Sequence, residues 1–381
     1  MPDFHTRFSS VPVLFYLAGI FIACFSAFLI LGKSRKITAD YILAIWFLII
    51  GVHLAYFVLF FSGAYVSFPY LLGLEIPFPL IHGPMLYLYI LCLTGKQPDI
   101  RSWLLHMAPA IIVYIILLKF LLLPAPDKLY VYQQGGSTYT ILRHSIKILI
   151  ILSGILYVTL SVLAVKNYKK QISERYSNTE KINLNWVYYL ITGIALIWIA
   201  VIIRNDILIF SFVDIFIMLA AYFGISRVGI LELKAVNYKI PEPEKLIDDH
   251  PVTVKYEKTF AGEDTLQQIY EQLSYQMTYK KLYKDPELDL NQVAALLNIH
   301  PNTLSQTINY MENKNFYDYI NRQRIEEFKR MAVLPENQKF TILSLAFESG
   351  FNSKTSFNRN FKKYMNCAPR EFLKHYIPNS E

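Results

Sequence analysis

The chain has 381 residues, of which 54% are hydrophobic, 15% aromatic and 17% charged, and its formal net charge is +8. This composition argues against a protein that is soluble along its whole length. The three cysteines have neither a metal-binding spacing nor the pattern of a disulfide framework. Hydrophobic residues are concentrated in residues 1–228, whereas the remainder has the charge density of a cytosolic domain. We therefore predict at least two domains.

Seven apolar segments in residues 1–228 are predicted to be transmembrane helices. A hydrocarbon core about 30 Å thick requires about 20 residues of helix. A buried core in a soluble protein is the alternative, but core helices of this length usually have a polar face. The predicted spans of this seven-helix bundle are residues 11–31, 41–61, 76–93, 103–123, 148–165, 186–203 and 207–225.

Basic residues in the loops predict the orientation of these helices. With the N-terminus outside, the cytoplasmic loops hold ten Lys and Arg residues and the outer loops hold five. Because basic loops stay in the cytoplasm, we expect an outer N-terminus and a cytoplasmic C-terminal domain. The cytoplasmic residues are Lys33, Arg35, Lys36, Lys96, Arg101, Lys166, Lys169, Lys170, Arg175 and Lys181, and the outer residues are Arg7, Lys128, Arg143, Lys147 and Arg204.

Polar side chains inside apolar spans are costly and therefore informative. His53, His82 and Asp214 lie at similar depth, roughly 9 to 12 Å from the outer ends of their helices at 1.5 Å per residue. With Arg204 near its mouth, this cluster predicts a signal-sensing site, either a ligand pocket or a protonation switch. Separate local partners for each side chain and a metal bound by the three are the alternatives. We predict no metal and no cofactor.

Residues 229–259 are predicted to be a juxtamembrane linker. Pro241, Pro243 and Pro251 interrupt a segment of Lys, Glu and Asp that has no helical stripe. A flexible chain of this length reaches about 30 Å, so residues 260–381 are expected to stay close to the membrane. Those residues carry 15 Lys and Arg against 14 Asp and Glu, so the positive charge of the protein lies mainly in the membrane half, residues 1–228.

Two helix-turn-helix patterns fill residues 260–381. In the first, at about 288–312, a short amphipathic helix is followed by a turn at 298–300 and a second helix. In the second, at about 340–365, Gly350 takes the turn and Ser353 can cap the next helix. A helix predicted at 316–333 is apolar on more than one side, so it can pack against both units.

The outward faces of the second helix in each pattern carry side chains suited to DNA. Amides and hydroxyls can pair with base edges, and Lys and Arg bind phosphates. For either pattern alone, a solvated helix surface is the alternative. The predicted DNA-binding residues are Asn302, Thr303, Ser305, Gln306, Asn309, Lys354, Thr355, Ser356, Asn358, Arg359 and Lys362.

The last third of the chain resembles the AraC/XylS family of bacterial transcription regulators. The resemblance is carried by LDLNQVAALLNIHPNTLSQTIN (288–309), NFYDYINRQRIEEFKRMA (315–332) and ILSLAFESGFNSKTSFNRNFKKYMNCAPREF (342–372). It implies two helix-turn-helix units on one central helix, with recognition helices that start near Asn302 and Lys354 and enter successive major-groove segments. His300 and Ala368 depart from the family pattern, and both are expected to weaken a helix cap. The whole layout resembles membrane-embedded AraC-type regulators of Bacteroidetes-like bacteria.

The sequence therefore predicts an all-α transcription regulator in the inner membrane of a bacterium. Its expected partners are double-stranded DNA, the lipid bilayer and a small-molecule or protein signal sensed in the membrane half, and a homodimer is left open. In one alternative, the membrane half is only an anchor controlled by a partner membrane protein. In another, the protein is a membrane enzyme or transporter with an appended regulatory domain, but the sequence has no phosphate loop, nucleophile motif or paired membrane carboxylates. We predict no enzymatic activity.

Overall fold

The computed structural model describes residues 10–203, 206–226 and 263–376. These residues divide into two compact units. The apolar unit holds residues 10–168 and 184–226, and the C-terminal unit holds residues 169–183 and 263–376. Apart from one isolated β-bridge, the regular elements in the described ranges are helices, which confirms the all-α prediction. The predicted linker at 229–259 and Arg204 lie outside the described residues.

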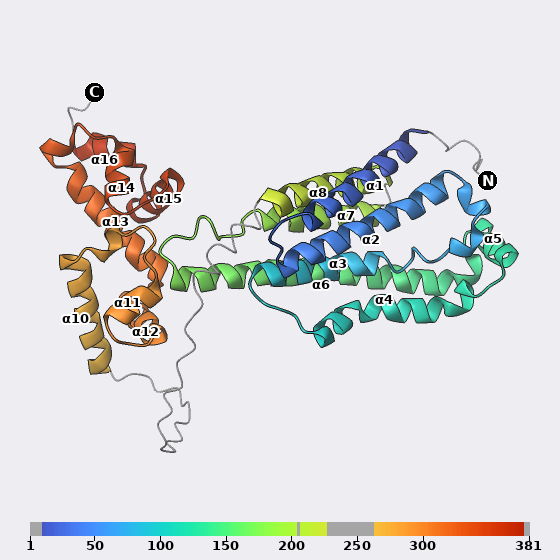
Figure 1. Cartoon of the computed structure of the whole chain (residues 1–381), viewed down its shortest axis with the longest axis horizontal. Helices are drawn as coiled ribbons and strands as arrows, with labels where there is room; N and C mark the ends of the chain where they lie inside the picture. The colour runs from blue at the N-terminus through green and yellow to red at the C-terminus, as the bar shows by residue number, and fades with distance from the viewer. Residues whose placement is uncertain (1–9, 204–205, 227–262, 377–381) are drawn as a thin grey trace, which may run out of the picture. The chain divides into compact units, whose positions relative to one another are not determined.

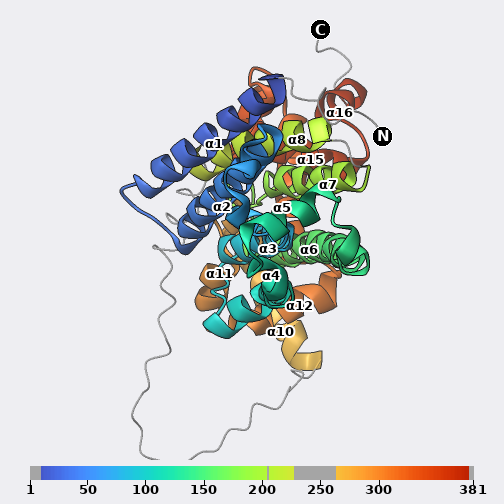
Figure 2. The same cartoon turned by 90° about the vertical axis from the view of Figure 1, so that its right-hand side faces the viewer.

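In the apolar unit, helices from distant parts of the sequence pack side by side (Figures 1 and 2). One hydrophobic core joins α1, α2, α3, α6, α7 and α8, and a smaller one joins α3, α4 and α6. The helices are α1 (Ser10–Leu31), α2 (Thr38–Phe61), α3 (Pro79–Leu93), α4 (Ile100–Leu121), α5 (Ala125–Gln133), α6 (Thr140–Arg175), α7 (Val187–Ile203) and α8 (Asp206–Ser226), with the 3-10 turns η1 (Ala64–Val66), η2 (Pro69–Leu71) and η3 (Ser137–Tyr139).

Five helices of the described chain are long and apolar enough to cross a membrane. They are Val13–Leu31, Thr38–Phe61, Ile100–Leu121, Ser137–Arg175 and Leu208–Ser226, whereas Pro79–Leu93 and Val187–Ile203 are apolar but shorter. The third predicted span, 76–93, begins later than predicted, at Pro79. Proline suits the first helical position because its missing N–H has no partner there in any case. The seven predicted spans thus correspond to five long apolar helices and two shorter ones.

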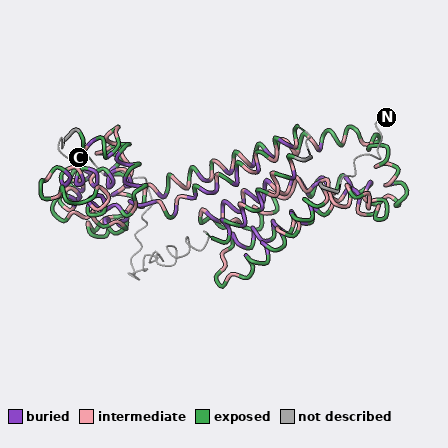
Figure 3. The backbone as a smooth tube through the Cα atoms, turned by 90° about the horizontal axis from the view of Figure 1, so that it is seen from above, coloured by how far each residue is buried: buried purple, intermediate pink, exposed green. Residues whose placement is uncertain are grey.

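The outer surface of the apolar unit is itself apolar. Figure 3 shows buried and exposed positions alternating along the helices of this unit. The exposed positions carry large apolar side chains, such as Phe21, Phe28 and Leu105, which are 68%, 71% and 71% exposed. A contiguous apolar surface of this kind is unfavourable in water and favourable in lipid. The unit therefore has the properties of a multi-pass membrane domain.

The C-terminal unit has two small cores that share one helix. The helices are α10 (Glu263–Tyr279), α11 (Leu290–Leu296), α12 (Pro301–Glu312), α13 (Phe316–Ala332), α14 (Ile342–Glu348), α15 (Lys354–Met365) and α16 (Pro369–Tyr376), with η4 (Leu282–Lys284) and η5 (Pro335–Asn337). Phe316 and Ile320 of α13 pack with α10, α11 and α12. Ile325 and Phe328 of the same helix pack with α14, α15 and α16. The predicted double contact of the central helix is therefore confirmed.

The structure shows the helix ends at the two positions that depart from the family pattern. His300 is the N-cap of α12, and its Nδ1 accepts a hydrogen bond from the backbone N–H of Asn302 at 3.1 Å. The prediction that His300 weakens this cap is therefore wrong, because an imidazole nitrogen replaces the usual hydroxyl acceptor. Ala368 has no side-chain acceptor, but Glu371 Oε2 accepts from the Ala368 N–H at 2.8 Å, which is the reciprocal half of a capping box.

Candidate nucleic-acid interface and membrane cluster

Helix α12 presents the first set of predicted DNA-binding residues. Asn302, Gln306 and Asn309 are exposed, while Thr303 and Ser305 are half-buried. The opposite side of the helix carries Leu304, Thr307 and Ile308, which are fully buried. This division leaves the amides of α12 available to base edges.

Helix α15 presents the second set. Lys354, Thr355, Asn358, Arg359 and Lys362 are all exposed. Ser356 is only 3% exposed, so the prediction that it faces outward is wrong. The reason is the helical repeat, because residues 356, 357, 360 and 361 form one continuous stripe against the core.

Tyr317 of α13 holds the outer face of α15 in place. Its hydroxyl accepts hydrogen bonds from Arg359 Nη2 at 2.6 Å and from Asn360 Nδ2 at 2.8 Å. Asn360 is buried, whereas Arg359 remains exposed beside the tyrosine ring. The arginine is therefore oriented before any ligand arrives, which lowers the conformational entropy lost on binding.

A groove of about 580 Å³ runs beside α15. Its lining includes Lys354 and Lys362 together with Arg370 from the start of α16. Three cations along one groove suit a phosphate backbone. Arg370 was not among the predicted site residues, although it belongs to the same C-terminal run of basic residues in the sequence.

The turn before α15 depends on a glycine. Gly350 has φ = +102°, and a Cβ at this position would collide with the backbone carbonyl oxygen of Tyr283. The predicted role of Gly350 as a turn residue is confirmed, and the close approach of Tyr283 explains why no larger residue fits.

Arg324 is a buried cation at the centre of the C-terminal unit that the sequence prediction missed. It is 1% exposed, and burial lowers its pKa to about 10, so it stays charged at neutral pH. All five of its N–H groups have an acceptor. The acceptors are Tyr283 O at 2.7 Å, Asp285 O at 2.7 Å, Ser177 Oγ at 3.0 Å, Ser177 O at 3.3 Å and Asn321 Oδ1 at 3.3 Å.

Ser177 belongs to a segment from the other half of the sequence. Residues 169–183 comprise the end of α6 and the loop before α7, yet they are part of the C-terminal unit. Ser177 donates from its backbone N to Leu288 O at 3.3 Å and from Oγ to the same oxygen at 2.6 Å. Tyr176 forms an antiparallel bridge with Asp289, and Asn321 Nδ2 donates to Ser177 O at 2.9 Å.

This docking segment, residues 169–183, is buried on the side that faces α13. Ser177, Asn178 and Thr179 are 0%, 7% and 8% exposed. Polar side chains are rarely buried this deeply unless they are hydrogen-bonded. The C-terminal unit therefore includes a buried piece of chain that comes from the end of α6 and the loop before α7.

In the apolar unit, the structure brings two of the predicted sensing residues together. His53 Nδ1 and His82 Nε2 are 2.9 Å apart, and Trp46 Nε1 lies 3.2 Å from His82 Nδ1. Because an indole nitrogen can only donate, His82 Nδ1 must accept. When both histidines are neutral, His82 then carries its proton on Nε2 and donates it to His53. The direction of the chain is Trp46 to His82 to His53.

Asp214 lies elsewhere. Its Oδ1 occupies the space that a Cβ on Gly19 of α1 would need, and it does not line the cavity of about 240 Å³ to which His53 and His82 belong. In the described ranges, no group of three or more His, Cys, Asp or Glu side chains is arranged to hold a metal ion. The structure thus pairs the two histidines without Asp214, and a sensing role for them stays a prediction.

Comparison with known families identifies the C-terminal unit. Residues 293–375 match a family described as a helix-turn-helix domain. No match to a curated protein or to a solved structure was found. The match covers α12 to α16 and reaches back into α11. The C-terminal unit therefore contains a helix-turn-helix domain of the AraC type, which points to a transcription regulator, preceded by apolar helices suited to a membrane.

Proposed function

We propose that the protein is a one-component transcription regulator that lies in the inner membrane of a bacterium and binds specific double-stranded DNA. The observation that carries the proposal is the pair of recognition helices α12 and α15. Each presents exposed amides or cations outward and a buried stripe inward, and both lie in the matched helix-turn-helix domain. In this assignment Gln306, Asn302 and Asn309 read bases, whereas Arg359, Lys354 and Lys362 bind phosphates.

The proposal includes control of DNA binding by a signal that the seven-helix membrane half receives, with the His53–His82 pair as one element of the sensing site. It is supported by the docking segment 169–183, which packs against α13 through Ser177. Helix α13 contributes to both helix-turn-helix cores. A change in the docking segment would therefore act on the helix that spaces the two recognition helices.

Two chimeras distinguish a membrane half that senses a signal from one that is only an anchor. Both replace residues 1–228 with an unrelated cytoplasm-facing membrane anchor, and the second keeps residues 169–183 in its cytoplasmic loop so that the C-terminal unit retains its buried partner. We expect the second chimera to bind the same chromosomal sites as the natural chain but to lose its response to growth conditions. If this chimera keeps the full response, the membrane half is only an anchor and the sensor is refuted.

Mapping of bound DNA across the genome tests the DNA-binding part. The natural chain should occupy a limited set of sites that share a sequence, and the nearby transcripts should change when the gene is deleted. Gln338→Ala, an exposed change outside both recognition helices, should leave the map unchanged, whereas Gln306→Ala should alter the shared sequence. A map without sequence preference contradicts the proposal.

A further inference from the structure

One end of the apolar unit is covered by folded segments rather than by plain connecting loops. Residues 62–78 form η1 and η2, and residues 122–139 form α5 and η3. These segments are tied together, because Lys128 Nζ donates to Tyr70 O at 3.1 Å and the Tyr132 hydroxyl donates to the carboxylate of Glu75. We call these two segments the cap. Helix α5 was not predicted, and its presence indicates that this end is built to hold a shape.

The cap fits closely onto the ends of the bundle helices. Gly73 has φ = +91°, and a Cβ there would collide with the ring of Phe120 in α4. The hydroxyl of Tyr114, also in α4, donates to Leu74 O at 2.7 Å. The contacts of Gly73 and Leu74 therefore fix the position of the cap on α4, and with it the size of the space between them.

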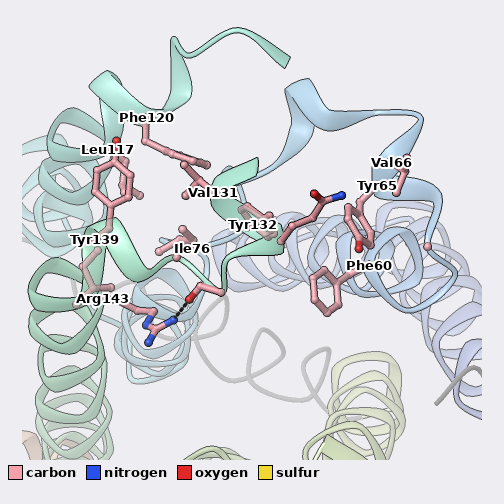
Figure 4. Close-up of a pocket in the computed structure, with 15 residues that line it drawn as sticks. Phe60, Tyr65, Val66, Ile76, Leu117, Phe120, Val131, Tyr132, Tyr139 and Arg143 are labelled. Atoms are coloured by element: carbon pink, nitrogen blue, oxygen red, sulfur yellow. Dashed lines mark hydrogen bonds between the residues drawn. The ribbon is translucent and has the colours of Figure 1, made fainter. Parts of the chain in front are cut away.

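That space is a cavity of about 810 Å³ (Figure 4). Phe60 and Tyr65 project into it from one side, and Leu117, Phe120, Val131 and Tyr139 line the other. Its volume lies within the range of about 300 to 1,000 Å³ that is usual for small-molecule sites, and its walls are of the apolar and aromatic kind that such sites have.

Among the fifteen described residues that line this cavity, Arg143 is the one with a charged side chain. Its Nη1 donates to the backbone oxygen of Gly135, as the dashed line in Figure 4 marks. No carboxylate of the described chain forms an ion pair with it. Glu75 of the cap accepts hydrogen bonds from the hydroxyl of the wall residue Tyr132 and from the N–H of Gly73. The cavity thus combines an apolar interior with one unneutralised cation.

We propose that this cavity binds an amphipathic monoanion, with its apolar body against the aromatic walls and its carboxylate or phosphate oxygens on Arg143. A guanidinium suits such a head group because it can form two parallel hydrogen bonds with it. The ligand is either a free organic acid or the head group and chain of an anionic lipid. Binding at this cavity does not depend on the proposed function, whereas a regulatory effect of binding does.

The cavity is connected through shared walls to the histidine pair. A second cavity of about 350 Å³ shares Phe60, Tyr65 and Tyr132 with the first and reaches Phe57. Phe57 also lines the cavity of about 240 Å³ that contains His53 and His82, and its ring centroid is 5.0 Å from that of His53. If a ligand displaces Phe60 or Tyr132, the displacement can therefore be passed to the histidines through adjoining side chains.

The test measures binding of radiolabelled decanoate to the full-length protein in phosphatidylcholine nanodiscs, with empty nanodiscs as background. Decanoate should bind saturably at one site, unlabelled decanoate should displace it, and decyltrimethylammonium, which has the same chain and the opposite charge, should not. Arg143→Gln should weaken binding about tenfold or more, and Arg143→Lys should recover part of the loss. Val131→Trp should abolish binding by filling the cavity, and Lys147→Gln, one turn further along α6, should leave it unchanged.

The absence of saturable binding overturns the proposal, as does equal affinity in Arg143→Gln and the natural chain. Nanodiscs that contain phosphatidylglycerol distinguish the two sources. If phosphatidylglycerol lowers the affinity of the natural chain for decanoate but not that of Arg143→Gln, an anionic lipid is the occupant. If the affinity of the natural chain for decanoate is the same with and without phosphatidylglycerol, the occupant is a free acid. Decanoate binding that has no effect on DNA occupancy would leave the site in place and contradict only its role in regulation.

Discussion

Arg324 and Ser177 are joined by two hydrogen bonds inside the C-terminal unit although 147 residues separate them in the chain. The arginine uses one N–H for the hydroxyl of Ser177 and another for its carbonyl oxygen, and both residues are buried. Its remaining N–H groups donate to Asn321 and to two backbone oxygens in the segment before α11. A single side chain thus connects α13, the segment that leads into the first helix-turn-helix unit and the docking segment.

This connection predicts that Ser177→Ala destabilises the C-terminal unit. The change leaves a buried N–H of Arg324 without its hydroxyl acceptor, which costs about 1–3 kcal/mol. Hydrogen–deuterium exchange of the full-length protein in nanodiscs should show faster exchange in residues 282–290 and in α13. Ser173→Ala is the matched control, because Ser173 lies on the same segment but is only half-buried, and its Oγ accepts from Asn315 Nδ2 at a longer 3.3 Å. Equal protection in the natural chain and Ser177→Ala would argue against a structural role for this bond.

The second prediction concerns base reading by α12. Gln306→Ala should cost about 1–3 kcal/mol at the cognate site and relax base preference at one position, because a bidentate amide contact to a base edge is lost. The measurement is the affinity of the full-length protein for cognate and random DNA at one salt concentration. Gln338→Ala should change neither value. An equal loss on both DNAs for Gln306→Ala would remove the base-reading assignment.

Phosphate binding by α15 gives the third prediction. Arg359→Ala should weaken binding to all DNA sequences and reduce the slope of log affinity against log salt by about one, because one fewer phosphate is neutralised. Tyr317→Phe keeps the ring but removes the hydroxyl that orients Arg359, so it should weaken affinity less and leave the slope unchanged. A sequence-dependent loss for Arg359→Ala would indicate that this residue reads bases instead.

The positions that the sequence predicts well are those set by local rules. The helical repeat of apolar residues predicts α11 to α15, and the need for a residue without Cβ predicts the turn at Gly350. Ser356 was placed wrongly, because the buried face of α15 includes residues 356 and 360 as well as Phe357 and Phe361.

The positions that the sequence does not predict depend on long-range contacts. Nothing in the local pattern of Ser177 distinguishes it from any other loop serine, and its burial becomes visible only when α13 packs against it. Arg324 was not singled out in the sequence, because its acceptors come from segments that are far from it along the chain. His53 and His82 were predicted to share a depth, but depth alone does not define the rotation of a helix, and Asp214 turned out to face α1.

The fourth prediction tests the turn between α14 and α15. Gly350→Ala should destabilise the second helix-turn-helix unit by about 2–4 kcal/mol, because it combines a positive φ with a collision against Tyr283 O. Exchange rates of amides in α14, α15 and α16 should rise, while those in α10 change less. Asn366→Gly is the control, since Asn366 also has a positive φ and glycine relieves strain there. A stable Gly350→Ala protein would mean that η4 can move away from the turn.

The last prediction concerns acid sensitivity. Glu327 of α13 is buried and accepts hydrogen bonds from Arg330 and from Lys281, and Lys284 is 3.1 Å away. These cations, Arg330 first, hold the pKa of Glu327 well below its ordinary value of 4.5. A lowered pKa in the folded state gives a stabilisation that is fully present above about pH 4.5 and is lost as the pH falls through the folded pKa.

Urea unfolding of the C-terminal unit in the full-length protein should therefore show a stability difference between the natural chain and Glu327→Gln that is constant near neutral pH and shrinks below about pH 4.5. Glu326→Gln, at the exposed neighbouring position that pairs with Lys329, should show no such trend. A difference independent of pH for Glu327→Gln would show that the charge of Glu327 contributes nothing to folding.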